Sequence, residues 1–86
     1  MNILLWAKTM KNTRLVKDCV LNVENYSIDN LTDYIKQICY NLDMETPILL
    51  SKHYRYIEQY NIVKFTKDDF VDYIDFDYFV IEKSEK

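Results

Sequence analysis

The fold prediction rests mainly on residues 47 to 81, PILLSKHYRYIEQYNIVKFTKDDFVDYIDFDYFVI. It holds the only proline, the only histidine and all four phenylalanines of the chain. Its pattern predicts an extended entry after Pro47, a short helix over 52–60 capped by Ser51, and a strand over 62–65. A capped helical turn and a closing strand over 76–82 are expected to follow. Short strands mixed with helices are typical of an α+β domain.

The helical turn in this stretch begins at a capping box. Thr66 stands three residues before Asp69, so each side chain can accept a hydrogen bond from the backbone N–H of the other residue. The turn is expected to divide its side chains between two faces. The inward set is Phe70, Val71 and Ile74, and the outward set is Asp68, Asp69 and Asp72.

N-terminal to this stretch, residues 2–9 and 15–23 predict an antiparallel hairpin. The chain has no glycine, and Asn12 is the residue best able to turn it in the left-handed conformation. Residues 2–9 carry apolar side chains on both faces, which predicts partial cover on each. The inward face of the second strand is expected to hold Leu15, Cys19, Leu21 and Val23.

Residues 30–42 predict the main amphipathic helix, because their apolar side chains recur at helical spacing. These side chains are Leu31, Tyr34, Ile35, Ile38, Cys39 and Leu42. At the other end of the chain, residues 83–86 are expected to fray. The expected fold is a single α+β domain over residues 1–86, with an N-terminal hairpin, this helix, short helices and two further strands in a sheet covered by helices.

Composition limits the classes of function. The 86 residues are 49% apolar and 15% aromatic, which predicts a packed core. The absence of glycine excludes the phosphate-binding loops of nucleotide enzymes, and no cofactor is expected. No secretion signal and no membrane span are apparent, and Cys19 and Cys39 are interpreted as free thiols. A cytoplasmic location without membrane contact is expected.

The segments PILLSKH and FTKDDFVDYIDFDYF, together with the early Trp-Ala-Lys at residues 6–8, resemble small uncharacterised proteins of low-GC bacteria and their mobile elements. In these proteins an extended segment ends in a Lys-His pair, and a DDF-type turn and an FDxF-type strand follow. The resemblance implies a free-standing single-domain protein and implies no activity.

Catalytic and metal chemistry have few candidates here. His53 is the only histidine, so a histidine-rich zinc site is excluded, and the nearby Ser51 lacks the glycine-containing context of a catalytic serine. His53 is interpreted as an early helix residue, partly exposed or bonded to local backbone. The carboxylates from Asp68 to Asp77 could bind a hard cation, but their spacing does not match a calcium loop. A solvated acidic face or a docking surface are the other interpretations.

We therefore predict a protein-interaction module and no enzyme. Its acidic face would dock on a basic surface of an unidentified protein, as an inhibitor or regulator does. The candidate partner surface consists of Asp68, Asp69, Asp72, Lys52, His53 and Arg55.

Two alternatives remain open. One is nucleic-acid binding through the basic hairpin residues Lys8, Lys11, Arg14 and Lys17, with Lys52 and Arg55. The other is a metal-assisted hydrolase that uses the aspartates and His53. The basic hairpin and the acidic run (Asp68, Asp69, Asp72, Asp75 and Asp77) could also neutralise each other within the fold. Alternatively, attraction between these charges, or an uncovered strand edge, could join two copies in a homodimer.

Overall fold

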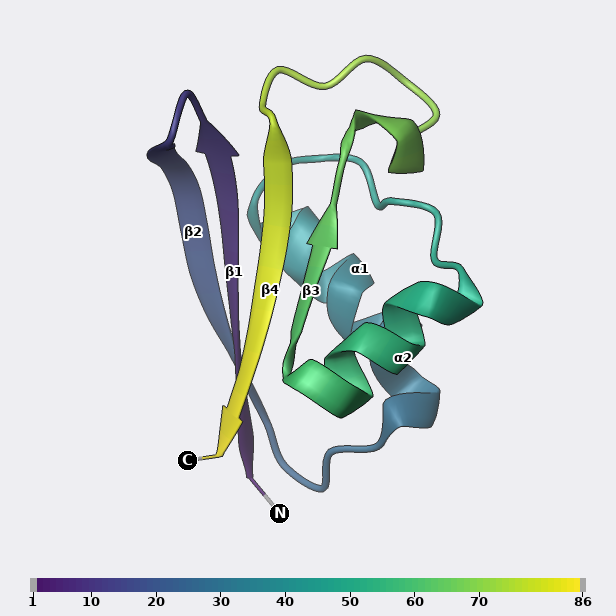
Figure 1. Ribbon diagram of the computed structural model, residues 1–86. Coiled ribbons are helices and arrows are strands. Elements are labelled where there is room, and N and C mark those ends of the chain that lie inside the picture. The colour runs from purple at the N-terminus through teal and green to yellow at the C-terminus, as the bar shows by residue number, and fades with distance from the viewer. Residues whose placement is uncertain (1, 86) are drawn as a thin grey trace.

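Four strands form one antiparallel sheet in the computed structural model, which describes residues 2–85 (Figure 1). The strands are β1 (Ile3–Lys11), β2 (Arg14–Val23), β3 (Ile62–Phe65) and β4 (Tyr78–Glu85). Their order across the sheet is β2-β1-β4-β3, so the last strand of the chain lies between the first strand and the third. The predicted α+β class and the N-terminal hairpin are confirmed.

The hairpin turns through Asn12 and Thr13, which both take the left-handed conformation, with φ of 52° and 63°. Two such residues make the turn type whose twist matches that of antiparallel strands. A register shift follows, because Thr9 pairs with Lys17 while Met10 pairs with Leu15. Leu15 therefore lies on the opposite face from Cys19, and its predicted inward position is wrong.

The part of the chain that the structure describes also forms two helices and two 3₁₀ turns. These are η1 (Ile28–Asn30), α1 (Leu31–Asn41), α2 (Ser51–Tyr60) and η2 (Lys67–Asp69). Helix α1 confirms the predicted main helix, and all six side chains of its apolar stripe are buried. Helix α2 begins one residue earlier than predicted. Its first turn is capped by His53, whose Nδ1 accepts a hydrogen bond from the backbone N–H of Leu50, and not by Ser51.

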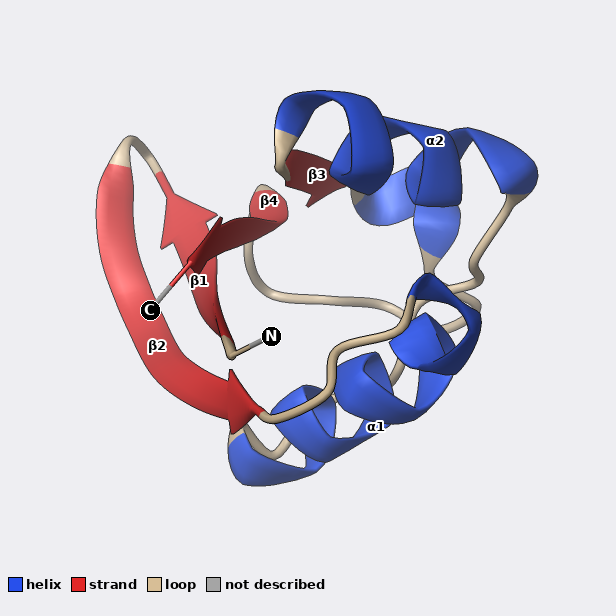
Figure 2. Ribbon diagram, turned by 90° about the horizontal axis from the view of Figure 1, so that it is seen from below, coloured by secondary structure: helices blue, strands red, loops and turns tan. Residues whose placement is uncertain are grey.

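Both helices lie on the same side of the sheet (Figure 2). The core between them contains Leu5 and Ala7 of β1, and Phe65 and Phe79, whose rings are 5.7 Å apart. Each large apolar side chain buried in this way contributes about 1.5 to 3 kcal/mol. The partial cover predicted for both faces of residues 2–9 is found on one face only.

The C-terminal part of the chain differs from the prediction in three ways. Turn η2 ends at Asp69, and without a further helical turn Val71 points outward and is 78% exposed, while Phe70 and Ile74 are buried. Strand β4 begins at Tyr78 and not at Phe76. It continues through Glu85, which pairs with Ile3, so residues 83–85 belong to the sheet and do not fray. Lys86 lies outside the described residues.

Candidate functional site

No described element covers the side of the sheet that faces away from the helices (Figures 1 and 2). Strand alternation places there the residues opposite to the buried ones. We call this surface the open face. It consists of Leu4, Trp6, Lys8, Met10, Leu15, Asp18, Val20, Asn22, Ile62, Lys64, Tyr78, Val80, Glu82 and Ser84.

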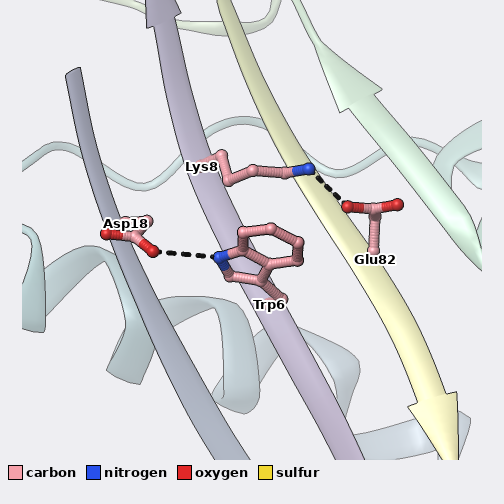
Figure 3. A network of polar contacts seen from close by, with 4 residues as sticks. All are labelled: Trp6, Lys8, Asp18 and Glu82. Carbon is pink, nitrogen blue, oxygen red and sulfur yellow. Dashed lines mark hydrogen bonds and ion pairs between the residues drawn. The ribbon is translucent and has the colours of Figure 1, made fainter. Parts of the chain in front are cut away.

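Trp6 lies in the middle of the open face and is 41% exposed. Its indole Nε1 donates a hydrogen bond to Asp18 Oδ2 of β2 over 3.1 Å. The ammonium of Lys8 lies 4.1 Å from the centre of the indole ring and forms an ion pair with Glu82 of β4 (Figure 3). Three neighbouring strands thus hold the ring in one orientation before any partner arrives.

The charges of the open face cancel. It carries two bases, Lys8 and Lys64, and two acids, Asp18 and Glu82. Lys64 lies 4.4 Å from the ring centre of Tyr78, which gives its charge an aromatic partner. A face with no net charge lacks the positive potential on which nucleic-acid binding depends.

Apolar side chains occupy most of the remaining positions. Val20 is 52% exposed, and Leu15, Ile62 and Tyr78 are exposed to a similar degree. An exposed patch that combines apolar side chains with tryptophan and tyrosine is typical of protein-docking surfaces.

The predicted acidic run does not form one acidic face. Asp69 is buried, and its Oδ2 accepts a hydrogen bond from the backbone N–H of Thr66 over 2.9 Å, which confirms the capping box. Asp75 forms an ion pair with Lys11, and Asp77 accepts from the backbone N–H of Asn12; both distances are 2.9 Å. The outward position predicted for Asp69 is therefore wrong.

Of the three aspartates in the predicted partner surface, Asp68 and Asp72 are exposed. The backbone N–H of Asp72 donates to Glu45 Oε1 over 3.3 Å, and this bond connects the loop between η2 and β4 to the segment before Pro47.

His53 lies inside the protein and is 1% exposed, so it is neither partly exposed nor part of a surface. Its Nδ1 accepts from Leu50 over 2.9 Å, which requires the neutral ring to carry its proton on Nε2. Nε2 lies 3.5 Å from Asp69 Oδ1, a distance too long for a good hydrogen bond. Burial lowers the pKa of His53, and the nearby Asp69 carboxylate opposes this shift.

His53 is therefore a helix cap in the core. Its predicted bond to local backbone is confirmed. Lys52 and Arg55 of the same helix are exposed, as predicted. The six residues of the predicted partner surface thus fall into two buried and four exposed side chains.

The basic residues of the hairpin are largely engaged within the fold. Lys8 pairs with Glu82, Lys11 with Asp75, and the ammonium of Lys17 donates to the carbonyl of Leu42 over 3.1 Å. The hydrogen bond to Asp75 also raises the pKa of Lys11. One of these contacts, the Lys11–Asp75 ion pair, joins the hairpin to the acidic run, so the charge asymmetry seen in the sequence cancels in part within the fold.

A cleft of about 370 Å³ opens beside the hairpin, between the segment that follows α1 and the loop that precedes β4. Three of its four charged side chains, all but Asp43, have partners among the described residues: Lys17 bonds to Leu42, Glu45 accepts from the backbone of Val71, and Asp75 pairs with Lys11. These bonds fasten the two segments to the sheet. The polar groups of the cleft thus serve mainly to hold these segments together.

Within residues 2–85, no group of three or more His, Cys, Asp or Glu side chains is placed to hold a metal ion. None of the described helices is long and apolar enough to cross a bilayer. Comparison of the chain with protein-family models, with curated proteins and with solved structures gives no match. The resemblance to small proteins of low-GC bacteria stays a prediction.

Sequence reasoning missed the open face. The signal was present in residues 2–9, where apolar side chains alternate on both faces of the strand. Residues 2–85 form two α-helices that cover the four-stranded sheet, and both lie on one side, so the second apolar face of β1 is left exposed.

Proposed function

We propose that this protein is an interaction module that docks on another protein through the open face, and that it is not an enzyme. The observation that carries the proposal is the exposed Trp6 ring, fixed between Asp18 and the Lys8–Glu82 ion pair on a sheet surface that also exposes apolar side chains. Tryptophan residues held in place before binding lose little conformational freedom and are often the energetic centre of an interface.

The charge balance of the open face favours a particular kind of partner. Its two bases and two acids already have partners within the face, so a strongly basic or acidic surface would gain little from them. The matching partner is an apolar protein surface of low net charge. Binding of this kind depends weakly on salt, whereas docking of acids on a basic groove weakens as salt rises.

The cysteines support a reducing location. Cys19 and Cys39 are both free thiols, and Cys39 is buried with its pKa raised to about 12 by burial. Because disulfides are characteristic of secreted domains of this size, we propose that the protein works in the cytoplasm.

The test is a pull-down from native lysate at low and moderate salt with the wild type, Trp6→Ala and Tyr40→Ala. Tyr40 is a matched control, since it is an aromatic residue of α1 that is 85% exposed and lies outside the open face. The wild type and Tyr40→Ala should capture the same stoichiometric protein at both salt concentrations. Trp6→Ala should weaken its binding by about 30-fold, the effect of a hot-spot residue worth about 2 kcal/mol.

Three results would overturn the proposal. Equal capture by Trp6→Ala and the wild type would show that the open face is not the docking surface. Capture that is lost at moderate salt, and also lost in the double variant Asp68→Asn/Asp72→Asn, would assign docking to Asp68 and Asp72. Recovery of nucleic acid without protein would favour the alternative through the basic hairpin. Circular dichroism of each variant checks that the fold is retained.

A further inference from the structure

Strand β2 forms one edge of the sheet, and among residues 2–85 its strand partner is β1 alone (Figure 1). It is ten residues long, whereas the opposite edge strand, β3, has four residues. Natural sheets protect their edges with short strands, prolines, bulges or inward-pointing charges, because an unprotected edge pairs with other strands. The length of β2 therefore raises the question of how its edge is protected.

Protection is present in the first half of β2 only. The register shift at Thr9 and Met10 places a bulge there, and the inward Lys17 reaches the carbonyl of Leu42. The segment from Asp18 to Val23, DCVLNV, has no proline and only one charge, and it keeps regular pairing with β1. This half has the features of a strand that accepts a partner.

Hydrogen bonds elsewhere in the sheet establish which backbone groups point to the free edge. The carbonyl of Met10 accepts from Asp77, so Met10 directs its backbone groups toward β4. Because direction alternates along an antiparallel strand, Ala7 directs its groups toward β2, and its partner Cys19 points back toward β1. The N–H and C=O groups of Asp18 and Val20 therefore point outward.

We propose that the 18–23 segment of β2 pairs with the same segment of a second copy, antiparallel and around a twofold axis at Val20, to give a continuous eight-stranded sheet. A strand pairs antiparallel with itself under twofold symmetry, which is the commonest symmetry of homodimers. The inference does not rest on docking through the open face.

Side-chain chemistry selects this register. An axis at Asp18 would bring two carboxylates directly opposite each other, which is destabilising. An axis at Val20 places Val20 opposite Val20 of the second copy and moves the two Asp18 carboxylates to either side of it. On the helix side, the half-buried Cys19 then faces Leu21 of the second copy, so apolar side chains meet on both faces.

Sedimentation equilibrium of the wild type, Val20→Pro and Lys64→Pro tests the dimer. Proline removes an N–H that points outward in both variants, since the bond from Lys83 to the carbonyl of Asn61 shows that Lys64 of β3 also points away from its ladder. The wild type and Lys64→Pro should be dimers, and Val20→Pro a monomer with unchanged circular dichroism. Trp6→Ala should remain a dimer, which separates this result from failure of the open-face proposal.

A second measurement tests the register and stays informative if Val20→Pro unfolds. In the Leu21→Cys/Cys39→Ala variant, Cys19 and the new cysteine of the second copy occupy a non-hydrogen-bonded pair with Cα atoms about 4.5 Å apart, within reach of a disulfide. Oxidation should yield a covalent dimer. Adding Cys19→Ser, or restoring Leu21, should abolish it. A monomeric wild type, or no covalent dimer in the Leu21→Cys/Cys39→Ala variant, would overturn the inference.

Discussion

The imidazole Nε2 of His53 lies 3.5 Å from Asp69 Oδ1, so a residue of α2 and a residue of η2 meet in the core. The His53 ring also lies 4.5 Å from the ring of Phe65 and caps the N-terminus of α2 at Leu50. Asp69 in turn caps its own turn at Thr66. The pair joins the second helix, the third strand and the loop before β4 into one unit.

Replacement of His53 by leucine should lower the free energy of unfolding by about 2 to 3 kcal/mol. The leucine fills the space of the ring in part, but the Leu50 N–H loses its acceptor, and an unsatisfied buried group costs about 1 to 3 kcal/mol. Urea unfolding measures the change. Lys52→Ala is the control, because Lys52 is exposed one residue away. A loss below about 0.5 kcal/mol for His53→Leu, which is the range of surface substitutions, would contradict the capping role.

Stability should rise with pH across the titration of His53. Burial lowers the pKa of the folded-state imidazole below 6.5, with Asp69 opposing the shift and Lys52 adding to it. Between the pKa values of His53 in the folded and unfolded states, the unfolded chain binds a proton that the folded chain does not. The stability that depends on the neutral imidazole is therefore complete above pH 6.5 and is lost as pH falls.

The measurement is urea unfolding over a pH series through this window. The His53→Leu variant should show a smaller pH dependence, since its folded and unfolded states no longer differ at this residue. An equal slope for the variant and the wild type would assign the pH dependence to other groups.

The three aspartates that the sequence places together should differ in their effect on stability. Asp69→Ala removes the acceptor of the Thr66 N–H and should cost about 1 to 2 kcal/mol, the usual cost of losing a helix cap. Asp68→Ala and Asp72→Ala affect exposed side chains and should each change stability by less than about 0.5 kcal/mol. Thermal unfolding of the three variants compares them, and equal effects would contradict the buried position of Asp69.

Tyr26→Phe should leave stability unchanged or raise it by about 1 kcal/mol. The hydroxyl of Tyr26 is buried and has no hydrogen-bond partner among the described residues, and burial raises its pKa to about 12. Removing an unsatisfied polar atom recovers its desolvation cost, while the ring still stacks on Tyr34 at 5.5 Å. Chemical denaturation checks this, with Tyr34→Phe as the control, because the Tyr34 hydroxyl accepts from the backbone N–H of Ser27.

Thr13→Gly should stabilise the hairpin by about 0.5 to 1 kcal/mol. Thr13 has φ of 63°, a left-handed conformation that is costly for a β-branched residue and open to glycine. The resulting Asn-Gly pair is the preferred sequence for this turn, although glycine also adds freedom to the unfolded chain and reduces the gain. A lower melting temperature than that of the wild type would contradict the expected relief of strain.

Elements that depend on local pattern were predictable from the sequence. Helix α1 follows from apolar spacing, and β3 was predicted with its observed bounds because Ile62 to Phe65 form a short, largely apolar run. The capping box of Thr66 and Asp69 was recognised for the same reason, since all its atoms lie within four residues.

Features that depend on distant contacts were not predictable in this way. His53 is buried because Phe65 and Asp69 close over it, and no local pattern contains that information. The outward position of Leu15 depends on a one-residue bulge, which reverses the faces of a strand without altering its composition. The open face exists because both helices pack on the same side of the sheet, which no local pattern specifies.

The position of β4 has a consequence for biosynthesis. This strand is made after all the others, yet β1 and β3 are joined only through it. While the ribosome still holds residues 78–85, both edges of the hairpin are unpaired. The side of the sheet that packs on the helices then lacks β4, the strand that joins β1 to β3. The cooperative fold therefore forms after translation of β4, through contacts such as that of Ile3 with Glu85 that span nearly the whole chain. A nascent chain stalled before this strand should be sensitive to protease and available to chaperones.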